Sequence, residues 1–136
     1  MNITLFSKLY AVALTTCLAI DLTWLTIVAK KFYLKHLGYI FADKPSLLIG
    51  LLFYLLFSVG LLIFVAFPAL EKKSIFKALS LGFLFGLIVY SAYDLTNHAT
   101  IKNWPPIVTI VDMLWGATLS CIVSGITFYI GRWLLQ

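Results

Sequence analysis

Three aspartates lie inside apolar segments of this chain: Asp21 in TTCLAIDLTWL, Asp94 in IVYSAYDLTNHAT and Asp112 in TIVDMLWGATL. A carboxylate at the centre of a membrane helix costs roughly 2.5–3.5 kcal/mol on insertion scales, so it normally faces protein or a polar cavity. Carboxylates that lie close together in such surroundings cannot all ionise. As a group they can bind a cation, relay protons or serve as general acid and base. These residues are therefore the candidate site.

The helix faces around the aspartates carry further polar and aromatic side chains. Residues three and four positions away share a helix face with each aspartate. Near Asp94 these positions supply hydroxyl, amide and imidazole groups. Near the other two aspartates they supply indoles, which donate hydrogen bonds or form a wall for a cation. The predicted ligand-binding residues are Asp21, Trp24, Tyr90, Asp94, Asn97, His98, Asp112 and Trp115.

Other kinds of site have less support in the sequence. A structural role is the alternative for each aspartate, in which hydrogen bonds to Tyr, Ser, Thr or Trp fix the helix register. No HExxH-like or CxxC-like spacing indicates a metal, and no phosphate loop or dinucleotide fingerprint indicates a cofactor. Cys17 and Cys121 are expected to be packing residues, and His98 an interfacial or packing histidine.

The composition predicts the elements that must position these residues. The 136 residues are 62% hydrophobic and 11% charged, and a soluble domain with so little charge would expose large apolar patches. A membrane helix needs about 20 mostly apolar residues. Four blocks meet this length, at about residues 9–28, 47–70, 78–98 and 107–130. We therefore expect an all-α fold, a single-domain integral membrane four-helix bundle with both termini on the same side.

The three aspartates are expected at similar depth in this arrangement. At roughly 1.5 Å per residue, Asp21 lies about 13 Å below the boundary marked by Lys30, and Asp94 about 12 Å below the one marked by Lys102. Asp112 lies about 9 Å into its own helix. Three carboxylates from three helices are thus predicted to share one half of the membrane.

Small residues and a proline predict how the helices pack and end. In the last two helices small residues recur at every fourth position: Ala78, Gly82 and Gly86, then Gly116, Ser120 and Ser124. Such stripes let membrane helices approach closely, so these helices are expected to form a tight antiparallel hairpin. Pro68 should bend or end the second helix. The connection at residues 30–45 contains KKFYLKHLGYIF, whose lysines and aromatic residues suit the membrane interface.

The basic residues say little about orientation. The net charge is +5, but the ten basic residues are dispersed over the helix ends, five on each predicted side. The positive-inside rule therefore gives no orientation. Nucleic acid is not expected as a partner, because no basic face or aromatic-basic motif accompanies the charge. The expected partners are membrane lipids and a small-molecule or ion ligand, and a transporter with so few helices would need a homo-oligomer.

Four segments carry a combination of motifs: DLTWL at 21–25, LLFYLLFSVGLLIFVAFPAL at 51–70, YDLTNHATIKNW at 93–104 and VDMLWG at 111–116. In these segments the chain resembles the bacterial family of small predicted membrane proteins called domain of unknown function 2177. The resemblance covers nearly the whole chain. It implies a multi-pass protein of the bacterial inner (cytoplasmic) membrane and no established activity. Its motif positions are Asp21, Trp24, Tyr93, Asp94, Asn97, Asp112 and Trp115.

Three functions fit these observations. The favoured one is the binding or transport of a cation, proton or small polar ligand at the three aspartates. The second is a membrane-embedded enzyme that acts on a lipid or isoprenoid, because acid–base chemistry near a headgroup layer is feasible with these side chains. The third is a structural or accessory membrane subunit in which the polar residues hold helices together.

Overall fold

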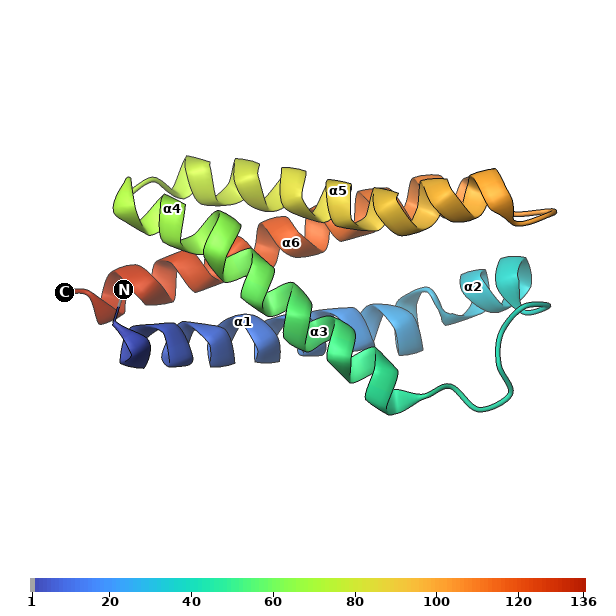
Figure 1. Ribbon diagram of the computed structural model, residues 1–136, viewed down its shortest axis with the longest axis horizontal. Helices are drawn as coiled ribbons and strands as arrows, with labels where there is room; N and C mark the ends of the chain where they lie inside the picture. Colours follow the sequence, from blue (N-terminus) through green and yellow to red (C-terminus); the bar gives the residue numbers. More distant parts are fainter. Residues whose placement is uncertain (1) are drawn as a thin grey trace.

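The computed structural model describes residues 2–136, which form helices and no strand. Four helical segments are long and apolar enough to cross a membrane: Ile3–Val28, Leu47–Glu71, Ile75–Thr100 and Pro106–Leu134. The expected all-α membrane architecture is confirmed. Figure 1 shows both termini at one end of the molecule and the short helix α2 at the other. The side of the membrane on which the termini lie stays a prediction.

The first and second spans each contain a π-helical turn. Helix α1 (Ile3–Thr23) runs into such a turn at Trp24–Val28, and helix α3 (Leu47–Leu61) does so at Leu62–Ala66. After the second turn the span continues as α4 (Phe67–Glu71), with Pro68 in its first helical turn. A proline lacks the N–H that an α-helix needs and clashes with the preceding turn. Here it interrupts the α-helical pattern and does not end the span.

The third and fourth spans form the close hairpin that the small residues predict. Helix α5 (Ile75–Thr100) begins at Ser74, whose Oγ accepts a hydrogen bond from the Lys77 N–H at 3.2 Å. Helix α6 (Pro106–Leu134) starts on a proline, which tolerates the first turn because its missing N–H would be unpaired there. A Cβ added at Gly86 would collide with the backbone oxygen of Gly116. This backbone contact requires glycine.

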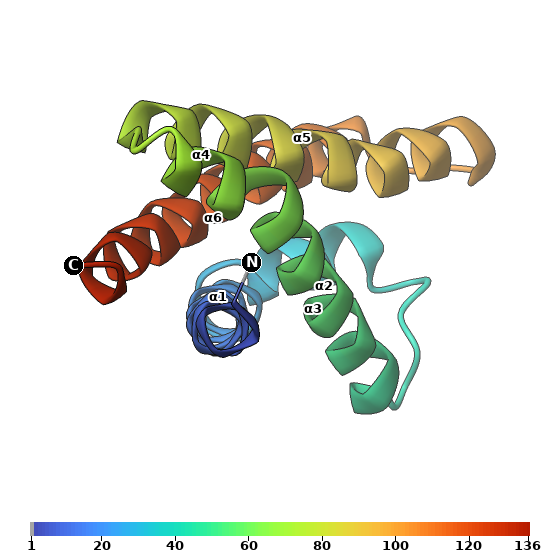
Figure 2. The same cartoon turned by 60° about the vertical axis from the view of Figure 1, so that its left-hand side comes forward.

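Helix α3 is set obliquely to the other long helices (Figures 1 and 2). The second half of its span contributes to the main core. There Leu61 of α3 and Leu62 of the following π-helical turn pack with residues of α1 and α6 such as Leu9 and Leu119, all fully buried. Its first seven residues, 47–53, are exposed. Figure 2 shows this half of α3 diverging from the α5–α6 pair. The molecule is therefore well packed near the termini and more open towards α2.

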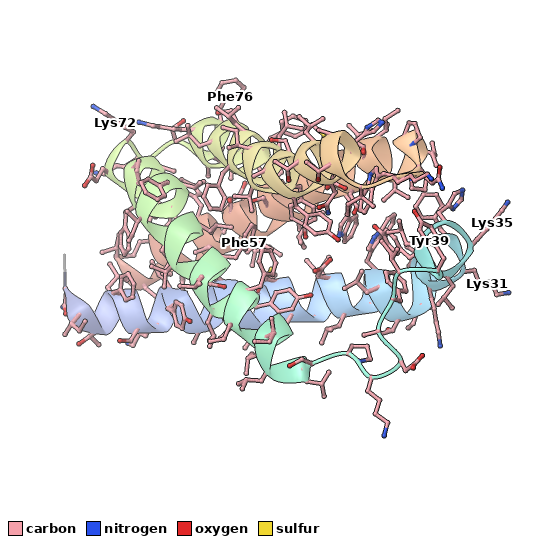
Figure 3. The ribbon with its side chains drawn as sticks, turned by 45° about the vertical axis from the view of Figure 1, so that its right-hand side comes forward. Lys31, Lys35, Tyr39, Phe57, Lys72 and Phe76 are labelled. Carbon is pink, nitrogen blue, oxygen red and sulfur yellow. The ribbon has the colours of Figure 1, made fainter. Side chains whose placement is uncertain are left out.

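Helix α2 (Lys30–Leu37) lies in the connection that was expected at the membrane interface. Its inner face buries Tyr33 and Leu37 against Trp104, in the loop before α6, and Val108, in the first turns of α6. Figure 3 shows Lys31 and Lys35 of α2 pointing away from the long helices, and Lys72 lies at the opposite end of the molecule. This docking places a tyrosine of the connection next to α6.

Candidate functional site

Asp21 is buried and fully engaged by side chains from two other helices. The residue is 3% exposed, and its carboxylate accepts hydrogen bonds from the Tyr54 hydroxyl of α3 and from Trp115 Nε1 of α6, both at 2.7 Å. Hydrogen bonds to an ionised carboxylate are about twice as strong as neutral ones. Asp21 therefore ties α1 to α3 and to α6.

Asp112 receives its hydrogen bond from the short helix α2. The Tyr33 hydroxyl donates to one carboxylate oxygen of Asp112, and Trp24 Nε1 in turn donates to the Tyr33 oxygen at 3.2 Å. Burial, and then the hydrogen bond to Asp112, raise the pKa of Tyr33. The phenol therefore keeps its proton and acts as a donor, which makes the docking of α2 part of the site.

The two tryptophans stack and link the Asp21 and Asp112 environments. Each follows an aspartate of its own helix by three residues, and the rings of Trp24 and Trp115 lie 4.0 Å apart with an interplanar angle of 8°. Helices α1 and α6 run in opposite directions here (Figure 1). Each tryptophan is therefore hydrogen-bonded to the aspartate of the other helix. Trp115 donates directly to Asp21, and Trp24 donates to Tyr33, which in turn donates to Asp112.

Asp94 has a different environment. Its side chain is fully buried in α5, and within residues 2–136 neither of its carboxylate oxygens has a hydrogen-bond donor. Its carboxyl lies close enough to that of Asp112 for a hydrogen bond once one of the two is protonated. With both ionised, the two groups only repel. One proton between them turns this repulsion into a bond.

A cavity of about 760 Å³ lies between α1, α2, α3, α5 and α6. Small-molecule sites usually measure roughly 300–1,000 Å³. The polar and aromatic part of its lining is Asp21, Asp112, Tyr33, Tyr54, Tyr90, Tyr93 and Trp115, with Lys30 as the one lysine. The apolar part includes Leu25, Leu37, Phe41, Ile49 and Phe53. Because Ile49 is 64% exposed and Phe53 39%, the cavity opens beside the start of α3.

The structure brings six of the eight predicted site residues together. Asp21, Tyr90, Asp112 and Trp115 line the cavity, Trp24 stacks on Trp115, and Asp94 adjoins Asp112. The Tyr90 ring lies where a side chain at Gly116 would be. The close hairpin thus also positions a cavity residue.

Asn97 and His98 do not line the cavity. His98 Nδ1 is 3.3 Å from the Thr109 hydroxyl, which accepts a hydrogen bond from Trp104 Nε1 at 3.0 Å. Asn97 lies near the Tyr93 phenol, one turn earlier on the same helix. Both residues share a helix face with Asp94, but they lie nearer the end of α5, where Thr109 of α6 is the polar partner of His98.

The sequence prediction missed Tyr33 and Tyr54 as site residues. Tyr54 stands in the run LLFYLLF, and a phenol inside an apolar membrane helix is a signal that its hydroxyl needs a partner. Tyr33 gave no such signal, since aromatic residues are ordinary at a membrane interface. Among residues 2–136, no three His, Cys, Asp or Glu side chains converge in a way that could hold a metal ion.

Four spanning-length helices define the chain as a multi-pass α-helical membrane protein. The family model described as "Predicted membrane protein (DUF2177)" matches residues 6–129, and the chain belongs to this family. The family resemblance of the sequence motifs is thereby confirmed. The comparisons with curated proteins and with solved structures gave no match.

Proposed function

We propose that this protein binds an organic cation in the cavity between α1, α2, α3, α5 and α6. The observation that carries the proposal is one cavity that combines two carboxylates, Asp21 and Asp112, with the rings of four tyrosines and a tryptophan. The sequence predicts a cation, a proton or a small polar molecule as the ligand. The composition of the cavity lining favours, among these, a cation with an apolar part.

The lining suits such a ligand for two physical reasons. A cation gains Coulomb energy from nearby carboxylates, and this gain is larger away from bulk water. Aromatic faces attract cations as well, by about 0.5–1 kcal/mol at exposed sites and about 2 kcal/mol where water is excluded. Leu25, Phe41 and Phe53 offer apolar surface for the rest of the ligand. Lys30 is exposed, and its long side chain can place the ammonium at the membrane surface, away from a bound cation.

Equilibrium binding of tetraphenylphosphonium to the protein in lipid nanodiscs tests the proposal. We expect saturable binding with a change in tryptophan fluorescence, because Trp115 lines the cavity. Asp112→Asn should weaken binding at least tenfold, whereas Asp43→Asn, which removes an exposed loop carboxylate, should not. Neutral triphenylphosphine oxide serves as the uncharged control. Unsaturable uptake, or equal affinity in the Asp112→Asn protein, would contradict the proposal.

Gly50→Leu tests the cavity without touching its charges. Gly50 lines the cavity, and a Cβ added there meets no atom within 4 Å. The larger side chain should therefore occupy ligand space, reduce tetraphenylphosphonium binding and leave the folded protein intact. Binding that is unchanged in this variant would place the cation outside the cavity.

A second candidate function is an enzyme that acts on a membrane lipid or isoprenoid. It is favoured by the carboxyl pair, since Asp112 faces the cavity and Asp94 behind it has no donor in the described chain, an arrangement suited to general acid–base chemistry. Membrane lipids of cells with the wild-type gene would be compared with those of cells with Asp112→Asn. Identical lipid profiles under several growth conditions would remove this candidate.

The cellular setting forms part of the proposal. We infer a four-span protein of the bacterial inner (cytoplasmic) membrane, surrounded by lipid, with both termini on one side and acting as a homo-oligomer if it transports its ligand. The support is the family's membrane character and the presence of both termini at one end of the molecule (Figure 1). Reporter fusions at each terminus test the shared side, and proteoliposome uptake of tetraphenylphosphonium tests transport.

A further inference from the structure

We propose that binding of the cation releases one proton that Asp94 and Asp112 share, so that this site exchanges a cation for a proton. The inference rests on the proposed function. It concerns a residue that the bound cation does not touch, because Asp94 lies behind Asp112 and outside the cavity lining.

The starting observation is that nothing around Asp94 stabilises an ionised carboxylate. It is fully buried, and across residues 2–136 neither oxygen has a donor. A buried ionised carboxylate without partners is costly by several kcal/mol, and such a group instead binds a proton. The carboxyl of Asp112 is within hydrogen-bond reach and can share this proton.

Asp112 has contacts on two sides. One side adjoins Asp94, and the other lines the cavity, where Tyr33 donates a hydrogen bond to it. A cation in the cavity therefore meets Asp112 directly and acts on Asp94 from a distance, through the shared proton and through its electric field. The two aspartates form a relay between the cavity and the buried interface of α5 and α6.

The exchange balances in charge. In the empty site one proton bridges the two carboxyls, and the pair carries a single negative charge. A cation beside Asp112 stabilises a second negative charge, so the O–H bond of the pair breaks and the proton leaves through the cavity to water. The pair then carries two negative charges and the ligand one positive charge. The total charge of the pair and the ligand is therefore the same before and after binding. This matters because added net charge is costly in a low-dielectric site.

Other titratable groups lie around the pair and its cavity: Asp21 of α1, Lys30 and Tyr33 of α2, Tyr54 of α3, and Tyr90 and Tyr93 of α5. Asp21 has its own two donors and acts as a fixed acceptor. Tyr33 keeps its proton because burial and Asp112 raise its pKa. Lys30 is exposed at the rim. The carboxyl pair is therefore the group that exchanges protons.

Proton release on titration with tetraphenylphosphonium tests the inference, in weakly buffered nanodiscs with a pH indicator. Wild-type protein should release about one proton per bound cation. By linkage its affinity should then rise by up to about tenfold per pH unit while the pair holds the proton in the empty site. Asp94→Asn should bind the cation with no proton release and with an affinity independent of pH. Asp94→Ala is a second variant with the same expectation, in case the first does not fold.

The outcomes separate this inference from the proposed function. Saturable binding without proton release, or pH-dependent binding that survives in both Asp94 variants, would overturn the exchange and leave the cation site standing. If tetraphenylphosphonium does not bind the wild-type protein, the proposed function itself fails.

Discussion

Asp21 and Asp94 are the same residue type in the same kind of helix, and both are buried, yet their surroundings are opposite. Asp21 accepts two hydrogen bonds, from Tyr54 and Trp115. Asp94 has no donor anywhere in the described chain, and its neighbour is another carboxyl. Burial alone therefore does not describe an aspartate's surroundings; its hydrogen-bond partners show whether the carboxylate is already satisfied.

The difference has a physical meaning. A buried polar group that is fully hydrogen-bonded fixes its helices in place, and one that is left unsatisfied costs stability. Proteins break such rules mainly at functional sites. Asp21 accordingly acts as the anchor of α1, α3 and α6. Burying the Asp94 carboxyl without a donor costs stability, and this cost suggests that the residue is present for a function.

Removing the anchor should have the largest effect. Asp21→Ala leaves the Tyr54 hydroxyl and the Trp115 N–H without their acceptor, and hydrogen bonds to charged groups contribute about 1.5–3 kcal/mol each. We expect a loss of about 3–5 kcal/mol in the free energy of unfolding, measured by reversible denaturation in mixed detergent. A loss below about 1 kcal/mol would show that Asp21 is not an anchor.

Removing one donor should have an intermediate effect. Tyr54→Phe deletes only the hydroxyl that reaches Asp21 at 2.7 Å, so the same measurement should show a loss of about 1.5–3 kcal/mol. Tyr10→Phe is the matched control, because its hydroxyl donates to the Leu55 carbonyl at 3.2 Å in a half-buried position. Its cost should be about 0.5–1.5 kcal/mol. Equal losses for the two variants would remove the special role of the Asp21 contact.

Neutralising Asp94 should have the smallest effect. The amide of an asparagine at this position can donate to Asp112, as the shared proton of the native pair does. Asp94→Asn should therefore change the unfolding free energy by less than about 1 kcal/mol, in the same denaturation measurement. Destabilisation of more than about 1 kcal/mol would mean that Asp94 is also an anchor.

The fold was largely predictable from the sequence because apolar block length and small-residue spacing are direct consequences of the membrane environment. Gly86 and Gly116 marked the α5–α6 contact in this way, and the structure confirms it. The oblique course of α3 was not predictable. It depends on how Leu61 and Leu62 pack while residues 47–53 stay exposed, and an apolar run does not encode that angle.

The site was predictable in its aspartates and not in their partners. A carboxylate in an apolar helix is conspicuous in any sequence, and helix depth placed Asp112 near Asp94. The partners Tyr33 and Tyr54 come from elements whose relative positions depend on tertiary packing. For the same reason the sequence grouped His98, one turn beyond Asp94, with that aspartate, whereas the structure places it beside Thr109.

Infrared spectroscopy of the protonated carboxyl group tests most directly whether the two aspartates differ as proposed. A proton shared by Asp94 and Asp112 predicts a carboxylic-acid carbonyl band in the wild-type protein at neutral pH. The band should persist in folded Asp21→Asn, disappear in Asp94→Asn, and be lost from the wild-type protein when tetraphenylphosphonium binds. A wild-type spectrum without this band, or a band that Asp21→Asn removes and Asp94→Asn retains, would contradict the assignment of Asp21 as anchor and Asp94 as proton carrier.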